Sequence, residues 1–260
     1  MTYSGIDVSE HNGIIDWQKV KPHISFAMIR AGYGSKTLDE KFKTNVMQCV
    51  ANKIPFGVYW FSYACTVEMA VKEARKCINA VKPFMLSLPI AYDFEYDSLE
   101  YAKKQGIIID GKLMSEMAKA FLEEVKAAGY EPMLYTNPDF WNRGFKKLGR
   151  TYPIWCAQWG VSKPSLYCDI WQDGIGTVEG ISTNVDMNVS YKFYPLKEKE
   201  KTVQEKIEEV NKKYCDKYEK IADDVIAGKY GNGNARKAKL ISENLDPSFV
   251  QDLVNAKVAI

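Results

Sequence analysis

Several parts that common catalytic machineries need are scarce or missing in this chain of 260 residues. His11 and His23 are the only histidines, and neither lies at a spacing typical of metal ligands. The chain has no Gly-x-Ser-x-Gly nucleophile elbow and no glycine-rich phosphate-binding loop. These absences argue against serine-hydrolase and nucleotide chemistry, and we expect neither a metal nor an organic cofactor.

An excess of charge of one sign is also missing. Lys and Arg number 35 against 33 for Asp and Glu, and the net charge of +2 gives no reason to expect nucleic acid as a partner. No run approaches the ~18 apolar residues of a membrane-spanning helix, so membrane insertion is not expected. The first residues lack the basic and apolar segments of a signal peptide, which predicts synthesis in the cytoplasm.

Cysteine is present but unpatterned. The six cysteines form no Cys-x-x-Cys pair, which argues against a zinc site and predicts free, mostly buried thiols. Apolar and aromatic side chains are plentiful, with 46% hydrophobic residues, 16 Tyr and 6 Trp. This composition supports a sizeable core and also supplies flat rings that are suited to stacking on sugars.

Short apolar strands alternate with helical patterns from residue 4 to about residue 194. Several strands are nearly continuous in apolar residues, which favours a parallel sheet or barrel with both faces covered. We expect eight strands, at Gly5–Ser9, Phe26–Gly32, Phe56–Tyr63, Leu88–Tyr96, Pro132–Thr136, Pro153–Trp159, Cys168–Gln172 and Asn184–Val189. We expect helices at Asp39–Asn52, Val67–Val81, Lys112–Ala128 and within Pro138–Leu148. The predicted fold class is α/β, an irregular (β/α) barrel with eight strands and fewer helices over residues 1–194.

Composition changes sharply after Pro195, where charged residues become dense. An apolar residue still recurs every three or four positions, at Val203, Ile207, Val210, Tyr214, Tyr218, Ile221 and Val225. This stripe predicts a charged linker helix over 195–218, and residues 203–225 are a candidate surface for a homodimer. A glycine-rich break at 228–234 and two short helices then predict a small C-terminal three-helix bundle over 219–260.

Two carboxylates one residue apart follow the apolar run of the fourth strand. Asp93 and Glu95 share a face if the strand continues through them. Like charges held close together raise the pKa of one partner, so that one carboxyl stays protonated while the other is ionised. Such a pair is costly without a function, and glycoside hydrolysis uses one.

Further candidates lie at the same ends of the strands. Asp7 in the first strand and Asp186 in the eighth become neighbours if the barrel closes, although each alone also fits an ordinary strand-end cap. The aromatic candidates for an elongated groove are Tyr33, Tyr59, Phe61, Tyr135 and Trp155. Gln158 and Gln172 are candidate donors to sugar hydroxyl or acetamido groups, although both equally fit solvated amides at strand ends. A single aromatic residue on a barrel strand is equally compatible with the core.

Ordered motifs along this region resemble the lysozymes of glycoside hydrolase family 25. The matching segments are Gly5–Ser9, Arg30–Gly34, Gly57–Phe61, Tyr92–Glu95, Leu134–Asn137, Trp171–Gln172 and Val185–Asn188. The resemblance implies hydrolysis of the β-1,4 bond between N-acetylmuramic acid and N-acetylglucosamine in bacterial peptidoglycan. It also implies that Glu95 is the general acid/base, that Asp93 stabilises or orients the reacting centre, and that Asp7 and Asp186 complete the acidic rim.

The tail resembles the muropeptide-binding cell-wall repeat of some phage lysozymes. The resemblance rests on residues 221–233, 235–237 and 250–255, and it implies cell-wall contacts for Gly231, Asn232, Gly233 and Arg236. The chain departs from the pattern in having a single copy and in having Asn234 where an acid is common. Together the two resemblances imply a phage endolysin that reaches the wall after release through a holin.

Two other functions stay open at this level. A chitinase-type barrel also attacks N-acetylated sugars, but its longer acidic strand signature is absent here. A catalytically silent wall-binding protein would need no acidic set, and this chain keeps one. Whether the reaction uses a protein nucleophile or the substrate's own acetamido oxygen also stays open.

Overall fold

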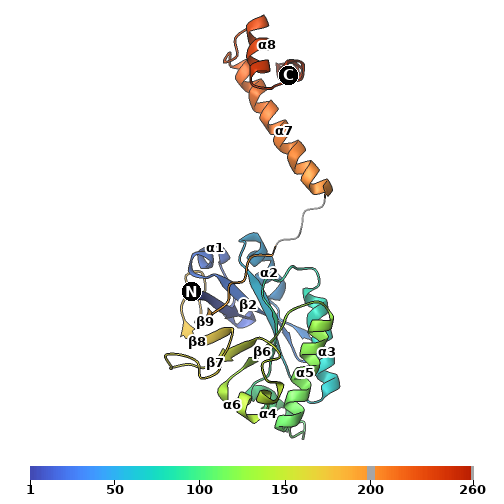
Figure 1. Cartoon of the computed structure of the whole chain (residues 1–260), viewed down its shortest axis with the longest axis vertical. Coiled ribbons are helices and arrows are strands. Elements are labelled where there is room, and N and C mark those ends of the chain that lie inside the picture. The colour runs from blue at the N-terminus through green and yellow to red at the C-terminus, as the bar shows by residue number, and fades with distance from the viewer. Residues whose placement is uncertain (198–202, 259–260) are drawn as a thin grey trace. The chain divides into compact units, whose positions relative to one another are not determined.

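A computed structural model describes residues 1–197 and 203–258 of the chain; the side chains of 203–211 and of Tyr214 lie outside the described part. The chain divides into two compact units, Met1–Glu198 and Lys199–Ile260. Each unit is described by itself (Figure 1).

The first unit is a closed barrel, as the sequence predicts. Its strands are β1 (Tyr3–Val8), β2 (Phe26–Tyr33), β4 (Phe56–Phe61), β5 (Ile90–Asp93), β6 (Pro132–Thr136), β7 (Ile154–Ala157), β8 (Ile170–Gly176) and β9 (Val185–Ser190). The order β1-β9-β8-β7-β6-β5-β4-β2 is closed by pairing between β1 and β2. A short strand that was not expected, β3 (Thr37–Leu38), pairs antiparallel with β2 outside the ring.

The barrel is not wholly parallel, and this differs from the expectation. Strand β9 runs antiparallel to both of its neighbours, β8 and β1, whereas the other pairs in the ring are parallel. Residues 177–184 connect β8 to β9 without a helix. A parallel return needs a long crossover, usually a helix, and so this short connection reverses the strand direction.

The barrel unit has fewer α-helices than strands, as expected. They are α1 (Trp17–Val20), α2 (Phe42–Ala51), α3 (Val67–Val81), α4 (Tyr96–Lys104), α5 (Gly111–Ala127) and α6 (Pro138–Arg143). Three short 3-10 helices, at Glu10–Asn12, Lys21–His23 and Phe145–Leu148, supplement them. Helices α1 and α4 were not predicted from the sequence. Helices α3 and α5 lie side by side on the outside of the barrel (Figure 1).

The predicted fourth strand is too long. Strand β5 ends at Asp93, and Glu95 is the N-cap residue of α4. The backbone N–H of Glu95 donates to Ser98 Oγ at 3.1 Å, which turns the chain out of the sheet and into the helix. The prediction failed here because an apolar run does not by itself reveal a capping interaction three residues further on.

Two parts of the core of the first unit frame the carboxyl ends of the strands, an outer one between the sheet and the helices and an inner one inside the barrel; a smaller cluster consists of Ile154, Cys156, Cys168 and Trp171. Trp60, Tyr92 and Phe94 belong to the outer part. The inner part includes Tyr59, Tyr135 and Trp155, whose rings meet edge to face at 5.8 Å for Tyr59–Trp155 and 4.8 Å for Tyr135–Trp155. These three rings form the floor beneath the carboxyl ends of the parallel strands. All six cysteines are free, and only Cys215 is exposed.

The second unit is the expected bundle of three helices, α7 (Val203–Ile226), α8 (Gly233–Ser242) and α9 (Pro247–Val258). Its core consists of Tyr218, Ala222, Val225, Tyr230, Leu240, Leu245, Val250 and Val254. Helix α7 is continuous, so residues 203–218 of the expected linker helix and the first helix of the repeat form one element. Residues 195–197, expected as the start of that helix, are not helical, and residues 198–202 lie outside the described part. The side chains of Val203, Ile207, Val210 and Tyr214 lie outside the described part. Among the described residues, no helix combines the length and apolar character needed to cross a membrane.

Candidate active site

Four carboxylates from three strands and one strand–helix junction meet at one end of the barrel. Asp7 lies directly opposite Asp186 in the β1–β9 pairing. Because β9 runs antiparallel, the start of β9 reaches the same end as the close of β1 and β5. The four acids line a cavity of about 260 Å³ together with Ser9, His11, Asn12, Arg30, Tyr59, Phe61, Tyr135, Trp155, Gln172 and Asn184. The structure thus brings together all four acids that the sequence singles out.

Asp93 and Glu95 face the same cavity, although only Asp93 is on the strand. Phe94, between them, points the opposite way and is buried in the outer core. Glu95 keeps an extended backbone, with φ of −129° and ψ of −170°. The alternation of side chains therefore continues one step beyond the hydrogen-bonded strand.

Asp7 is held by a network of amides. Asp7 Oδ2 accepts hydrogen bonds from Gln172 Nε2 at 2.9 Å and from Asn188 Nδ2 at 2.8 Å. Gln172 Oε1 in turn accepts from the Tyr135 hydroxyl at 3.1 Å, and Asn188 Oδ1 accepts from Trp155 Nε1 at 2.7 Å. Gln172 Nε2 also lies 3.5 Å from Asp186 Oδ2. This network orients Asp7, and its hydrogen bonds restrict the side-chain conformations of the residues on the floor of the cavity.

Burial and mutual repulsion make these carboxyls weak acids. Desolvation, followed by the charge of Asp186 and then that of Asp97, raises the pKa of Glu95 to about 7. Desolvation, followed by Asp186, raises the pKa of Asp7 to about 7, against the opposing hydrogen bonds from Asn188 and Gln172. Desolvation also raises the pKa of Asp186. The site therefore retains protons near neutral pH, as a general acid requires.

Asp93 is the most deeply buried member of the set. Its side chain is 4% exposed, and Asp93 Oδ1 has no hydrogen-bond partner. Burial, followed by the charges of Glu95 and Asp7, raises the pKa of Asp93, whereas Arg30 opposes the shift. A buried carboxyl oxygen without a protein partner destabilises the fold unless a bound molecule donates a hydrogen bond to it or a proton neutralises it.

The aromatic candidates divide into two groups. Tyr59, Phe61, Tyr135 and Trp155 line the four-acid cavity. Tyr33 lies instead in an adjoining cavity of about 330 Å³, which it shares with Glu10, His11, Arg30, Phe61, Tyr63 and Asp97. His11, Arg30 and Phe61 line both cavities, so the two are neighbouring parts of one depression.

Gln158 lies outside both cavities. Its Oε1 accepts from the backbone N–H of Ser165 at 2.7 Å and from Ser165 Oγ at 2.8 Å. Its backbone carbonyl accepts from Trp171 Nε1 at 2.8 Å. Gln158 thus bonds within its own loop, which the spacing of the residues did not reveal, and Gln172 is the amide that reaches the acids.

Five polar residues of the cavity were missing from the predicted set: Ser9, His11, Asn12, Arg30 and Asn184. Arg30 stands within the motif used for the family resemblance, and His11 follows the first strand closely. Ser9 and Asn184 lie next to the ends of β1 and β9, and for these two residues that position was the available signal. Among the described residues, no group of three or more His, Cys, Asp or Glu side chains is arranged to hold a metal ion.

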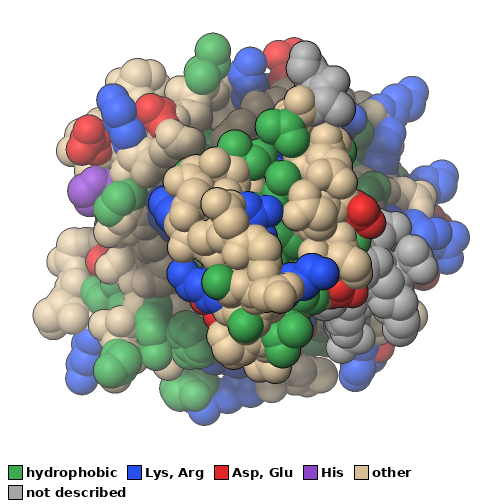
Figure 2. Space-filling view, turned by 90° about the horizontal axis from the view of Figure 1, so that it is seen from above, with side chains coloured by type: hydrophobic (Ala, Val, Ile, Leu, Met, Phe, Trp, Pro, Cys, Tyr) green, Lys and Arg blue, Asp and Glu red, His purple; other side chains and the backbone are tan. Residues whose placement is uncertain are grey.

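The four predicted residues of the tail also come together. Arg236 Nε donates to the Gly231 carbonyl at 3.0 Å, and Arg236 Nη2 donates to Asn232 Oδ1 at 3.0 Å. Gly231 and Gly233 have positive φ angles of 68° and 56°, which explains glycine at both turns. Gly233 and Arg236 line a cavity of about 510 Å³ between α8 and the start of α9. Figure 2 shows Lys and Arg side chains on the surface seen from above.

Comparison with known proteins gives this site a family. Residues 6–176 match the model of glycosyl hydrolases family 25, and residues 219–258 match that of the CW_7 repeat. Lysozyme M1 of Streptomyces globisporus is 28% identical over 200 residues, which cover 71% of this chain and 66% of that lysozyme. The lysozyme of Streptococcus phage Cp-7 is 24% identical over 262 residues, which cover 96% of this chain and 68% of that lysozyme.

Solved structures agree with the sequence comparison. The modular autolysin LytC of Streptococcus pneumoniae, solved with a synthetic peptidoglycan ligand, superposes with a TM-score of 0.65 at 26% identity. The match covers 73% of this chain but only 47% of LytC, so this chain corresponds to about half of that autolysin. Because the family model covers more than half of its length, the chain belongs to glycosyl hydrolase family 25.

Proposed function

We propose that this chain is a muramidase that hydrolyses the β-1,4 bond between N-acetylmuramic acid and N-acetylglucosamine in bacterial peptidoglycan. Membership of family 25 and the lysozyme names of its relatives support this substrate. The observation that carries the proposal is the pair Asp93 and Glu95 in one acidic cavity, with the pKa of Glu95 raised to about 7. A carboxyl that is still protonated near neutral pH is suited to protonating a leaving oxygen.

Glu95 acts first as an acid and then as a base in this proposal. Its proton passes to the glycosidic oxygen as the bond to the sugar breaks and an oxocarbenium-like centre develops. The Glu95 carboxylate then takes a proton from the water that attacks this centre. The residue ends each cycle protonated, as it began.

Asp93 stabilises the same centre in this proposal by the negative charge that it carries once it loses its proton, against the burial and the neighbouring acids that raise its pKa. Either a carboxylate or the substrate's own acetamido oxygen stabilises the positive carbon, and in both routes an ionised Asp93 is favourable. The unpartnered Asp93 Oδ1 is the protein atom available for this contact. Asp7 and Asp186 keep the field of the site negative, which favours a cationic transition state over a neutral ground state.

The neighbouring cavity lengthens the sugar-binding groove. Phe61 contributes to both cavities, and its ring lies 5.1 Å from that of Tyr63. Tyr33 and Tyr63 meet edge to face at 6.5 Å. Flat rings around a depression provide stacking surfaces for successive sugar units.

Replacing Glu95 by Gln tests the assignment. The amide keeps the shape of the side chain but cannot transfer the proton, so release of muropeptides from purified peptidoglycan should fall at least ~100-fold. The same replacement at Glu100, an exposed residue of α4, is the matched control and should leave the rate unchanged. Release at the parental rate by the Glu95→Gln variant would falsify the assignment.

Analysis of the products separates the muramidase from the chitinase-type alternative. Mass spectrometry of reduced fragments should find new reducing ends on muramic acid. New reducing ends on glucosamine would refute the proposed bond specificity, and no release by the parental protein would favour the silent wall-binding alternative.

We further propose that the C-terminal unit binds the cell wall in the setting of a phage endolysin. The CW_7 match and the cavity at Gly233 and Arg236 support this role. A homodimer through residues 203–225 stays a prediction, because most of the apolar stripe lies outside the described side chains.

A further inference from the structure

One buried carboxyl group of the barrel unit takes no part in the proposed reaction. Glu73 on α3 is fully buried, and it lines neither the four-acid cavity nor the second cavity, which Tyr33 lines. Among the described residues, its carboxyl group meets a hydroxyl and a backbone N–H but no Lys or Arg. A buried acid without a cation calls for its own explanation.

Both oxygens of Glu73 hold the chain just beyond β4. Glu73 Oε2 accepts from Ser62 Oγ at 2.6 Å, and Oε1 accepts from the backbone N–H of Tyr63 at 3.1 Å. Ser62 Oγ in turn accepts from the backbone N–H of Ala64 at 3.2 Å. One side chain of α3 therefore fixes residues 62–64.

These contacts begin where the pairing of the strand stops. Strand β4 ends at Phe61, and the backbone N–H of Ser62 still donates to the Asp93 carbonyl at 2.7 Å. The next N–H, that of Tyr63, donates to Glu73 instead. Ser62 is fully buried, whereas the Tyr63 side chain lines the second cavity with Phe61, as the alternation of a strand requires. Glu73 therefore extends the geometry of the strand to Tyr63.

Tyr63 contacts rings from three elements. The centre of its ring lies 5.1 Å from that of Phe61 on β4 and 6.5 Å from that of Tyr33 on β2. It lies 5.0 Å from that of Tyr101 on α4, which is 38% exposed. A shift of the Tyr63 backbone therefore changes the aromatic surface of the second cavity.

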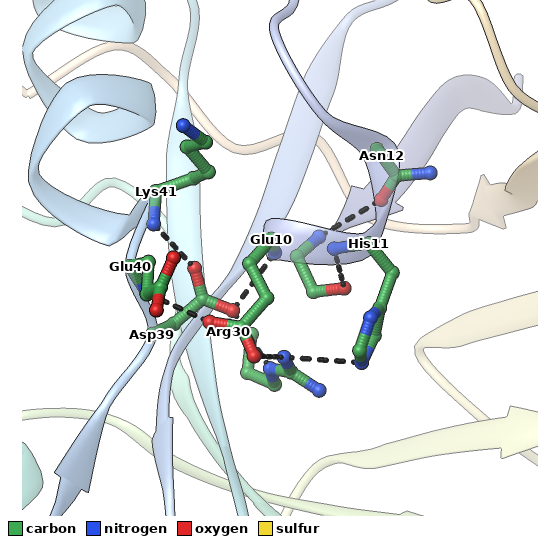
Figure 3. A network of polar contacts seen from close by, with 8 residues as sticks. Glu10, His11, Asn12, Arg30, Asp39, Glu40 and Lys41 are labelled. Carbon is green, nitrogen blue, oxygen red and sulfur yellow. Dashed lines mark hydrogen bonds and ion pairs between the residues drawn. The ribbon is translucent and has the colours of Figure 1, made fainter.

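The charged side of the second cavity is held by its own residues. Arg30 Nη2 lies 2.9 Å from Glu10 Oε1, and both residues line this cavity. Arg30 Nε also lies 2.8 Å from Asp39 Oδ2 (Figure 3). Among the described residues, the aromatic side has no such polar pair within the lining, and Glu73 supplies the polar contact from outside the cavity.

We propose that Glu73 is a positioning residue, which fixes Tyr63 and so determines how tightly the second cavity binds the glycan strand. The inference rests on the proposed function, because it takes a peptidoglycan glycan as the ligand of this cavity. Stacking on a sugar depends on the place and tilt of the ring, so a displaced Tyr63 should weaken binding. The four acids have no recorded side-chain contact with Glu73 and should keep their geometry.

The split between KM and kcat tests this role. In Glu73→Leu, the side chain fills space but accepts no hydrogen bond. The KM for a soluble peptidoglycan fragment of two disaccharide units should rise about three- to tenfold, and kcat should change less than about twofold. Glu73→Gln keeps an oxygen that can accept from the Tyr63 N–H, so its KM should stay within about twofold of the parental value. Glu116→Leu, at an exposed position of α5, is the matched control and should leave KM unchanged.

A double-mutant cycle separates positioning from a merely structural role. With Tyr63→Ala in place there is no ring to position, so adding Glu73→Leu should raise KM by less than about twofold. Calorimetric titration of the same fragment into Glu95→Gln proteins, with and without Glu73→Leu, should show the same loss of affinity without any turnover.

An unchanged KM in folded Glu73→Leu would overturn the proposal, as would equal rises in KM in both backgrounds or a kcat that falls more than KM rises. Thermal unfolding identifies a variant that does not fold. If Glu73→Leu is such a variant, Ser62→Ala removes only one of the two contacts and should raise KM about twofold. No rise in that variant would then contradict the proposal. Failure of the proposed function has a different signature, which is a Glu95→Gln variant that retains the parental rate.

Discussion

At the scale of single residues, burial raises the pKa of carboxyls both inside and outside the candidate site. Glu73 on α3 is fully buried, and desolvation raises its pKa to about 7, as in Glu95. Glu73 accepts from Ser62 Oγ at 2.6 Å and from the backbone N–H of Tyr63 at 3.1 Å. It lines neither cavity of the groove. A raised pKa therefore identifies a candidate only together with access to the substrate.

Glu73 gives a prediction about stability and pH. Its folded-state pKa lies above the ordinary value of 4.5, so the folded protein binds more protons than the unfolded chain between these pH values. Stability from this residue is present below pH ~4.5 and is lost as pH rises to ~7, by up to about 3 kcal/mol. In Glu73→Gln this pH-dependent contribution disappears. The difference in unfolding free energy, variant minus parent, should therefore become more positive as the pH rises from 5 to 8.

Chemical denaturation at several pH values measures this difference. The same replacement at the exposed Glu100 serves as the control for a lost surface charge. A constant difference between Glu73→Gln and the parent across the range would contradict the prediction.

At the scale of elements, the close approach of α5 and α6 depends on glycine. A Cβ on Gly111 would overlap the carbonyl oxygen of Arg143, and Gly144 faces it from the other side. Ser115 Oγ joins the two segments by donating toward the carbonyls of Gly111 and Gly144, at 2.8 Å each. The contact secures the helix that follows α4, and Glu95 is the N-cap residue of α4.

Gly111→Ala should therefore separate α5 from α6. The added methyl meets backbone instead of a flexible side chain, so we expect a loss of about 1–3 kcal/mol or more in unfolding free energy. Gly174→Ala is the matched control, because a Cβ there meets nothing within 4 Å. Equal unfolding midpoints for both variants in urea would show that the segments move apart without cost.

At the scale of the whole molecule, chemistry and wall binding are proposed to reside in separate units. The barrel is closed by its own strands, and the C-terminal bundle has its own apolar core. Each unit therefore has the structural basis to fold alone. One repeat adds a second contact with a polymeric substrate, which raises the effective concentration of the enzyme at the wall.

Truncation after residue 198 tests this division. The shortened protein should hydrolyse soluble glycan fragments at the parental rate, because the whole acidic cavity lies in the first unit. On intact cell walls its rate should fall several-fold as the second contact is lost. Equal rates on both substrates would refute a role of the repeat in wall binding. Light scattering of both proteins also tests the expected homodimer.

The sequence by itself determined the barrel class, the family and the four acids. Apolar periodicity and ordered motifs are local features of a sequence. For that reason the helix α3 was predicted at its observed bounds, Val67–Val81. The comparisons confirm the family resemblance. Roles of individual residues stay predictions until they are measured.

Only the tertiary structure decided which side chains meet. Three features depend on how the chain closes. They are the antiparallel pairing of β9, the position of Tyr33 in the second cavity and the hydrogen bonds from Ser165 to Gln158. Gln172 and Asp7 are 165 residues apart yet hydrogen-bonded, and Arg30 joins segments on either side of it. Such contacts depend on chain closure and desolvation, which no local pattern encodes.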